Sequence, residues 1–523
     1  MTNPHDYTQR GWMACTLLIF TLLAISFIPP QSVIGLSLRR VNILSDLITF
    51  NDPTSSPSSD GIFAFEEAEY AIDLKEVAAQ VAEMQPHTVT THYLWTTGET
   101  KQTAEIKSYP RPLTQPSTPI EDFDSTANSR MKSLYTKLLT YGTPVHIAVL
   151  GDSFIEGDIL TADLREKLQS AFGGCGAGFA PMASPLTGFR RTIKTQARNW
   201  TPYNIMQRKS TPAALASNYT ISGWVCRASE GASTRWEGTT SRLHLDSCNQ
   251  ARLFFISRQN SQVEVTLNDT QKRIFEIEGD EALRQIDVTG AIRSIAMKVI
   301  SGNSGFIGYG AQFSGEEGVT VDNYSIRSNN GQAMFWTDPA LNVELDNQAG
   351  GYDLVILQYG LNILQKGVRN YSKYGEQIEN MIAFVRQCFP TAAVLVLGVS
   401  DRSTRTDDGS GFIPMDSAPY LINCQRAAAQ HTGAAFWSTY DAMQARGGMA
   451  GFVNHGWAGK DYTHINFGGG RQIAHDLFDA LYNEVFMLQQ KTLSRQIHRH
   501  ELEPTLTPQA EAWLYQDTIH PRP

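Results

Sequence analysis

Three side chains that together can transfer an acyl group occur in two short motifs of this sequence. Ser153 ends the run Gly151-Asp-Ser153, which lies between an apolar stretch and an amphipathic one. A serine on such a strand-to-helix turn has its hydroxyl held clear of the sheet, so Ser153 is a candidate nucleophile. The run Asp461-Tyr-Thr-His464 places a carboxylate three residues before an imidazole. His464 would take the serine proton, while Asp461 would orient the ring and stabilise its charged form.

The same reaction needs hydrogen-bond donors for the oxyanion that develops on the carbonyl oxygen. The candidates are the backbone N–H of Ser153, the backbone N–H of Gly331 and the side-chain amide of Asn362. Each such donor typically lowers the barrier by about 3 kcal/mol. Every one of these motifs also has a purely structural interpretation, because Gly-Asp-Ser, Asn-Asn-Gly and a lone asparagine are common in turns and caps. An Asp and His pair is likewise often a surface hydrogen bond.

Alternating strands and helices are expected to position these residues. Predicted strands cover residues 145–150, 318–326, 353–359, 393–397 and 434–438, and predicted helices cover 129–141, 159–172, 374–389, 418–431 and 468–487. Such alternation is typical of an α/β domain with a flavodoxin-like parallel sheet, whose ligand site lies at the carboxyl ends of the strands. Residues 151–153, 330–331 and 360–362 are expected to meet there.

The pattern changes between residues 200 and 317, where short runs follow one another without helices, as at 220–225, 251–256, 263–267 and 295–300. This indicates an inserted antiparallel β-sandwich, so that the α/β domain consists of residues 129–199 and 318–490. Trp224 and Trp236 could stack on sugars, although a place in the sandwich core is the favoured interpretation. The glycines of residues 173–178 predict a flexible active-site loop rather than a nucleotide cradle. Cys226 and Cys248 would pair in an exported protein, or remain thiols otherwise.

The N-terminal part has a different composition. Residues 11–28 contain no charged residue and predict a membrane anchor within residues 1–30. Residues 31–128 are rich in Pro, Ser and Thr and predict a tether, with one short helix within residues 66–84. Residues 491–523 are left as a C-terminal tail. A net charge of −9 argues against a nucleic-acid partner. The six cysteines show no metal-binding spacing, and the proposed chemistry calls for neither a metal nor an organic cofactor.

The motifs GDS, a later glycine, GxN and DxxH, in this order, resemble the four blocks of the SGNH/GDSL hydrolases. The resemblance covers residues 129–195 and 318–490, and it implies that Ser153, Gly331, Asn362 and His464 are the four block residues, with Asp461 completing a triad. The sequence departs from the family pattern at Ile363, where an acidic residue usually follows GxN.

The β insertion on a tethered chain is similar to bacterial peptidoglycan O-acetylesterases and related O-acetyltransferases. This resemblance implies a serine esterase that removes acetyl groups from acetylated polysaccharide or peptidoglycan. It also implies a membrane-anchored location with the catalytic domain outside the cytoplasm, periplasmic or extracellular. An O-acetyltransferase with the same triad and a non-catalytic glycan-binding envelope protein are the alternatives.

Overall fold

The computed structural model describes residues 32–33, 36–37, 71–84, 89–98, 112, 116–126, 129–185 and 188–502. The chain divides into two compact units, residues 1–64 and 65–523. In the first unit, strands β1 (Ser32–Val33) and β2 (Leu36–Ser37) pair antiparallel. The predicted anchor at residues 11–28 lies outside the described residues. Within the part of the chain that is described, no helix has both the length and the apolar character to span a membrane.

The second unit contains a six-stranded sheet in the order β15-β5-β16-β17-β20-β4. Its strands are β5 (Pro144–Gly151), β15 (Gly318–Ser325), β16 (Leu354–Gln358), β17 (Ala393–Gly398), β20 (Ala435–Ser438) and β4 (Glu121–Asp122). The first five are parallel, and β4 pairs antiparallel with β20 at the edge. Four of the parallel strands are mainly apolar, β15 includes the polar residues Thr320, Asp322 and Asn323, and all five are buried almost throughout, as expected for a sheet covered on both faces. The parallel strands follow the flavodoxin-like order that the sequence predicts.

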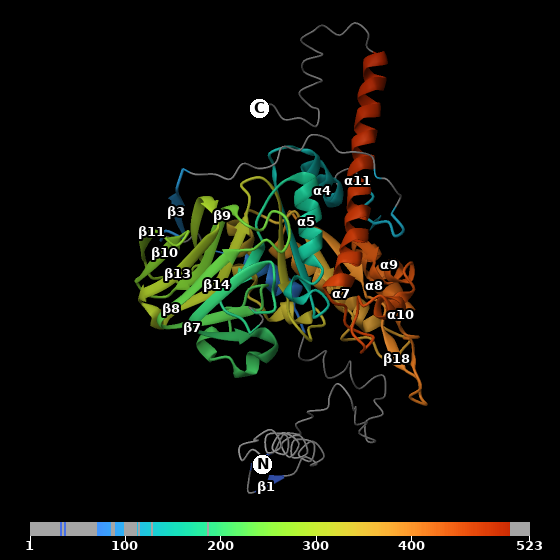
Figure 1. Ribbon diagram of the computed structural model, residues 1–523, viewed down its shortest axis with the longest axis horizontal. Coiled ribbons are helices and arrows are strands. Elements are labelled where there is room, and N and C mark those ends of the chain that lie inside the picture. Colours follow the sequence, from blue (N-terminus) through green and yellow to red (C-terminus); the bar gives the residue numbers. More distant parts are fainter. Residues whose placement is uncertain are drawn as a thin grey trace, which may run out of the picture. The chain divides into compact units, whose positions relative to one another are not determined.

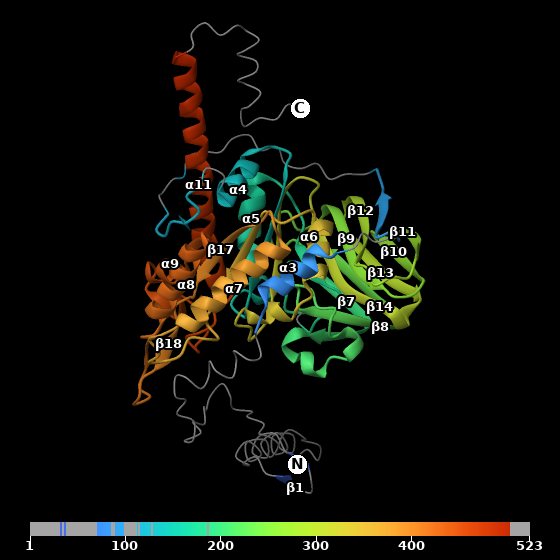
Figure 2. The ribbon, with the colours of Figure 1, turned by 180° about the vertical axis from the view of Figure 1, so that it is seen from behind.

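Helices cover both faces of this sheet. On one face α4 (Arg130–Leu139) and α5 (Thr161–Phe172) pack against α11 (Phe467–Leu502), as Figure 1 shows. On the other face lie α6 (Pro339–Ala349), α7 (Ser372–Cys388) and α8 (Ala418–Thr432), as seen in Figure 2. The short helices α9 (Thr439–Gln444) and α10 (Gly448–Asn454) follow β20. The predicted tail is wrong in part, because α11 continues to Leu502.

A ten-stranded β module is inserted between α5 and β15. Its strands are β6 (Gly178–Pro181), β7 (Ile193–Asn204), β8 (Trp224–Gly238), β9 (Cys248–Ser257), β10 (Ser261–Leu267), β11 (Gln271–Ile277), β12 (Arg284–Ile292), β13 (Ser294–Ser301) and β14 (Phe306–Ser314), joined by β3 (His92–Thr96). The predicted boundary at residue 200 is therefore wrong, because β6 and most of β7 precede it. Polar, exposed positions in β7 conceal this strand from a search for apolar runs.

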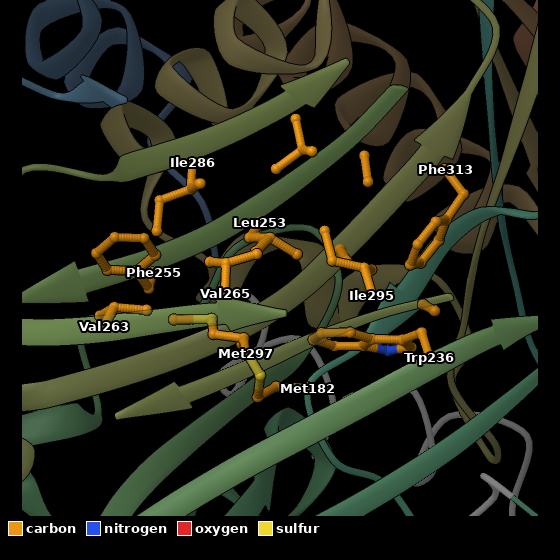
Figure 3. Close-up of a cluster of buried hydrophobic side chains, with 14 of the residues drawn as sticks. Met182, Trp236, Leu253, Phe255, Val263, Val265, Ile286, Ile295, Met297 and Phe313 are labelled. Atoms are coloured by element: carbon orange, nitrogen blue, oxygen red, sulfur yellow. The ribbon is translucent and has the colours of Figure 1, made fainter. Parts of the chain in front are cut away.

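The strands of the module, predicted as an antiparallel β-sandwich, are connected by hydrogen bonds into one sheet. The long strand β8 makes the connection: Cys226 and Arg227 pair with β14, whereas residues 233–237 pair with β13. Between these two parts, Gly231 has a φ of 68°, which favours glycine where the strand bends. Side chains from both parts enclose one apolar core, in which Trp236 is completely buried (Figure 3).

The N-terminal tether is also partly structured, which corrects the prediction for residues 31–128. Helix α3 (Leu74–Ala82) lies against α6 and α7, and β3 pairs parallel with β12. Composition alone does not reveal β3, because this strand is held by main-chain hydrogen bonds to a strand almost 200 residues later in the chain. Alternate side chains of β3 are exposed, so the strand is not an apolar run. The predicted helix within residues 66–84 corresponds to α3.

A buried carboxyl group joins the module to the α/β domain. Asp322 of β15 accepts hydrogen bonds from the backbone N–H of Phe179 (2.7 Å), from Gln312 Nε2 (2.6 Å) and from the Tyr352 hydroxyl (2.6 Å). Burial raises the pKa of Asp322, and these donors counteract the increase. Strands β6 and β14 are thus fixed to β15 by one fully buried residue.

The glycines of residues 173–178 lie at this junction rather than at the site. A Cβ added to Gly174 or Gly178 would lie 2.5 Å from the Val319 carbonyl oxygen or 2.1 Å from that of Val321. The prediction of a flexible active-site loop is therefore wrong, because close backbone packing against β15 requires these glycines. Cys226 and Cys248 are separate buried thiols.

Candidate active site

Ser153 follows the carboxyl end of β5, in a turn that is closed by a hydrogen bond to the side chain of the preceding residue, Asp152. The backbone N–H of Phe154 donates to Asp152 Oδ1 (2.9 Å), and Asp152 is completely buried. Ser153 is the one residue of 151–156 that is not buried. The turn therefore holds Asp152 inside the domain and presents Ser153 at the surface of the sheet's carboxyl edge.

Asn362 joins the three turns that the sequence predicts to converge. Its Nδ2 donates to Asp152 Oδ2 (3.1 Å) and to the carbonyl oxygen of Asn329 (2.9 Å). The turns after β5, β15 and β16 are thus connected by one amide group. Because an amide NH₂ has two hydrogens, Asn362 can donate to an oxyanion only by releasing or sharing one of these bonds.

Gly331 is required at its position for steric reasons. Its φ is 99°, and an added Cβ would lie 2.4 Å from Met381 Sδ and 2.9 Å from the Tyr359 ring. Its backbone N–H already donates to Asn329 Oδ1 (2.9 Å). Gly331 therefore belongs to the turn, as the structural interpretation of Asn-Asn-Gly expects, and its role as an oxyanion donor would require Asn329 to move.

His464 and Asp461 form a close pair in the loop before α11. His464 Nδ1 lies 2.7 Å from Asp461 Oδ2, and the backbone N–H of His464 donates to Asp461 Oδ1 (3.1 Å). Both side chains are about half exposed, at 52% and 51%. Partial burial disfavours the ionised form of Asp461, but hydrogen bonds from the His464 ring and from backbone N–H groups outweigh it and lower the pKa of Asp461 to about 2.

Ionised Asp461 determines which nitrogen of His464 is available. A carboxylate can only accept hydrogen bonds, so the short contact assigns the ring hydrogen to Nδ1. Nε2 then carries the free lone pair of the neutral ring and can accept a proton. This is the tautomer that a general base next to a serine needs.

The His464 loop and the Ser153 turn also interact electrostatically. Burial raises the pKa of Asp152 to about 7, while the N–H of Phe154, the charge on His464 and the amide of Asn362 lower it. A charge on His464 therefore acts electrostatically on the turn that carries Ser153. The structure thus brings Ser153, Asn362, Asp461 and His464 to one edge of the sheet.

A β-hairpin supports the His464 loop from outside. Strands β18 (Ser403–Arg405) and β19 (Phe412–Pro414) pair within the mostly polar segment between β17 and α8. The Phe412 ring stacks on Tyr462 with centroids 4.0 Å apart, and Ser403 N–H donates to the Tyr462 carbonyl oxygen (3.0 Å). Tyr462 has a φ of 54°, which is unusual for a residue with a side chain. The hairpin therefore helps to fix the turn between Asp461 and His464.

No family model matches this chain, and no curated protein sequence matches it. Among solved structures, it is similar to a peptidoglycan O-acetylesterase with a TM-score of 0.57 and 21% identity, over 70% of this chain and 99% of that one. A GDSL-like lipase from Parabacteroides merdae covers 32% of this chain and 74% of its own, with 14% identity and a TM-score of 0.25. A family two carbohydrate esterase from Cellvibrio japonicus covers 57% and 98%, with 9% identity and a TM-score of 0.24.

The first of these similarities spans nearly the whole of the other chain, and it agrees with the strand order and with the convergence of the four motifs. The protein has the SGNH hydrolase fold. The prediction of an SGNH-type hydrolase is thereby confirmed at the level of the fold.

Within this SGNH hydrolase fold, Ile363 replaces the usual acidic residue without opening the loop. Ile363 is buried, and the N–H groups of Ile363 and Leu364 both donate to the Gly360 carbonyl oxygen at 3.0 Å. Backbone hydrogen bonds therefore close the turn that carries Asn362.

Sequence reasoning missed three contributors to the candidate site. Asp152 is visible in the GDS motif, but its contact with Asn362 depends on the fold. Asn329 is visible in Asn-Asn-Gly, and an asparagine two residues before a glycine could have indicated that its side chain caps the turn. Phe412 lies in a polar segment, and nothing in its spacing indicates contact with Tyr462.

Proposed function

We propose that this protein is a serine esterase that removes O-acetyl groups from a cell-wall or extracellular glycan. The observation that carries the proposal is the 2.7 Å contact between His464 Nδ1 and Asp461, at the same sheet edge as the turn of Ser153. Asn362, whose amide donates to Asp152 in that turn, is a candidate donor for an oxyanion.

The reaction follows from these positions. Ser153 Oγ attacks the acetyl carbonyl carbon, and His464 Nε2 takes the hydroxyl proton. The carbonyl oxygen gains negative charge, which the N–H of Ser153 and one hydrogen of Asn362 Nδ2 stabilise. The proton on His464 passes to the leaving sugar hydroxyl, and an acetyl-serine remains. Water, activated by His464, then releases acetate and restores Ser153.

The substrate class rests on the similarity of fold to a protein named peptidoglycan O-acetylesterase. A glycan of this kind lies outside the cytoplasm, and we extend the proposal to a periplasmic or extracellular catalytic domain attached through residues 11–28. Protease digestion of intact and of permeabilised cells tests this location. Digestion of residues 129–490 only after the outer membrane is permeabilised fits a periplasmic domain, and digestion in intact cells fits an extracellular one. A domain that is digested only after the cytoplasmic membrane is broken contradicts both locations.

Hydrolysis of an aryl acetate by the full chain tests the chemistry. Ser153→Ala should lower kcat/KM by at least about 10³-fold, and mass spectrometry of the quenched wild-type enzyme should find acetyl on the peptide that contains Ser153. Ser170→Ala is a matched control, because Ser170 Oγ also lies 3.0 Å from a histidine, Nε2 of His244, in an exposed pair.

Equal activity of wild type and Ser153→Ala would reject the proposal and favour a non-catalytic glycan-binding protein. Adding an oligosaccharide acceptor to the assay separates hydrolysis from transfer. Free acetate should remain the main product, whereas acetylated acceptor in excess of acetate would identify an O-acetyltransferase.

A further inference from the structure

A groove lies between the β module and the loop that follows β15. Its volume is about 860 Å³, and its walls come from β7, from the start of β8, from residues 183–185 and from residues 325–328. The acetyl group that the proposed reaction removes would fill only a small part of this volume, which is in the range of sites for much larger ligands. A ligand of the groove therefore extends well beyond the ester.

The groove is continuous in sequence with the candidate active site. Glu156 in its wall is three residues after Ser153, and Ser328 is three residues before Gly331. Arg327 connects the two segments, because its Nε and Nη2 donate to Glu156 Oε2 at 2.9 and 2.6 Å. A chain lying in the groove would thus pass directly to the turn of Ser153.

The walls of the groove are held at a fixed separation. Gly223 at the start of β8 has a φ of 68°, and an added Cβ would lie 2.0 Å from Ile326 Cδ1. The junction at Asp322 secures β6 and β14 to β15 nearby. Because both contacts join the module to the α/β domain, the groove is a preformed feature of the second unit.

The lining combines aromatic rings with amide groups. Trp224 is half-buried in the wall, and its side chain has no hydrogen-bond partner among the described residues. Trp200 also lines the groove and packs on Phe306 from the module core. Three amide side chains complete the lining, those of Asn199, Asn204 and Gln207. Flat apolar rings with a few placed polar groups suit a sugar, which presents C–H faces and hydroxyl edges.

The charged residues of the groove indicate which class of glycan it can bind. Its charged lining residues are Glu156, Arg198 and Arg327. Glu156 is neutralised by Arg327, whereas the exposed guanidinium of Arg198 has no ion-pair partner in the described part of the chain. The protein as a whole carries a net charge of −9, so an unpaired arginine in this groove indicates a ligand with a carboxylate.

We propose that the groove binds the glycan chain that carries the acetyl ester, with Trp224 stacking on a sugar ring and Arg198 contacting a carboxylate on the chain. This inference rests on the proposed function and specifies its substrate as an acidic acetylated glycan. It also gives the two tryptophans that the sequence leaves open different roles, since Trp236 lies in the core and Trp224 lines the groove.

Binding to the full chain with Ser153→Ala tests the groove without turnover. The probes are O-acetylated glycan strands that carry stem peptides with free carboxylates, and neutral O-acetylated xylo-oligosaccharides, both measured by calorimetry. Trp224→Ala should raise the Kd of both probes about tenfold, and Trp224→Phe, which keeps a ring, should raise it less. Arg198→Gln should raise the Kd of the acidic strands about tenfold and leave that of the neutral probe within about twofold.

Two surface substitutions outside the groove are the controls. Tyr141→Ala removes an exposed ring and Arg293→Gln removes an exposed guanidinium, and both should leave the Kd values unchanged. Unchanged binding by Trp224→Ala and Trp224→Phe, with circular dichroism spectra like that of wild type, would overturn the groove as the binding site. An equal loss of both probes in Arg198→Gln would overturn the carboxylate contact.

The kinetic experiment separates this inference from the proposed function. In wild-type background, Trp224→Ala should lower the ratio of kcat/KM on acetylated glycan strands to kcat/KM on aryl acetate about tenfold. Acetate release that depends on Ser153 with an unchanged ratio would reject the groove and leave the esterase. If wild type releases no acetate from either substrate but its glycan binding is weakened by Trp224→Ala, the esterase is rejected and the groove is retained as a binding site.

Discussion

The turn that carries Ser153 and the loop that carries His464 each contain an aspartate, and the two carboxyl groups have opposite surroundings. Asp152 is fully buried, and burial raises its pKa to about 7. Asp461 is about half exposed and receives three hydrogen bonds, and its pKa falls to about 2. The same residue type thus serves as an internal connector in one region and as a permanent negative charge in the other.

This difference indicates how the site divides its tasks. The turn is closed, and Asp152 holds Asn362 through a bond that depends on both loops. The loop is open to solvent, and its geometry depends on the hairpin that stacks on Tyr462. Substitutions in the turn should therefore affect stability and catalysis together, whereas substitutions in the loop should affect catalysis with little effect on stability.

The largest effect is expected for Asp461→Asn. The amide would no longer fix the ring hydrogen on Nδ1 of His464, and kcat/KM on aryl acetate should fall about 10⁴-fold. The melting temperature should stay close to that of wild type, because Asp461 is half exposed. Asp479→Asn is the matched control, since Asp479 Oδ2 lies 2.9 Å from His475 Nδ1 in an exposed pair on α11. Retained activity in Asp461→Asn would remove the distinction between the two aspartates.

Asn362→Ala tests the bridge between the turns. Loss of one oxyanion donor should lower kcat about 10²- to 10³-fold with a smaller change in KM. The carboxyl of Asp152 would also lose a partner, so the melting temperature should fall, unlike that of Asp461→Asn. Asn347→Ala, at an exposed position of α6, should change neither quantity. A loss of stability without loss of kcat would leave Asn362 a structural role alone.

The pH dependence of stability should distinguish the two carboxyl groups by sign. The folded pKa of Asp152 is about 7, above the unfolded value of about 3.9, so its proton is lost less readily from the folded state. The free energy of unfolding should therefore fall as pH rises from about 4 to about 7, by an amount on the order of a few kcal/mol. Asp461 has the opposite shift, and its contribution is present above about pH 4 and lost as pH falls toward 2.

Urea unfolding at pH 4.5 and pH 7.5 measures this difference. Asp152→Asn should reduce the fall in unfolding free energy between the two pH values, whereas Asp461→Asn should leave that fall as in wild type. Identical pH dependence in wild type and Asp152→Asn would show that Asp152 is ionised throughout, and would contradict its assignment as a buried acid.

The smallest effect is expected at the hairpin. Phe412→Ala removes the stack on Tyr462, which is worth roughly 0.5–1.5 kcal/mol for an aromatic pair. If that energy helps to fix the loop, kcat/KM should fall between about 2- and 10-fold, with only a small fall in the melting temperature. Ile413→Ala, at the exposed neighbouring position, is the control. A melting temperature that falls while kcat/KM is unchanged would separate the hairpin from the site.

The sequence predicts the part of this molecule that local patterns control. Four of the five parallel strands are mainly apolar runs that the sequence reveals directly. Ser153 and Asn362 follow two of these strands, Asp461 and His464 lie in the loop before α11, and all four stand in short motifs that can be recognised without the fold. Asp152 shows the limit of this reasoning, because burial raises its pKa and its partner Asn362, which lowers that pKa, lies 210 residues later in the chain. The sequence misplaces the module boundary because most β7 side chains are exposed or only half-buried, and this strand is defined by its pairing with β8.

Strand β3 has a practical consequence for recombinant work. It covers the outer edge of β12, and the backbone N–H of Gln285 and the carbonyl of Thr289 extend this pairing to Thr91 and Thr97. A truncated protein that begins at residue 129, where the hydrolase motifs start, would leave that edge without its strand. Open sheet edges recruit other chains, so such a product should aggregate during expression. A start at or before residue 71 retains both β3 and α3.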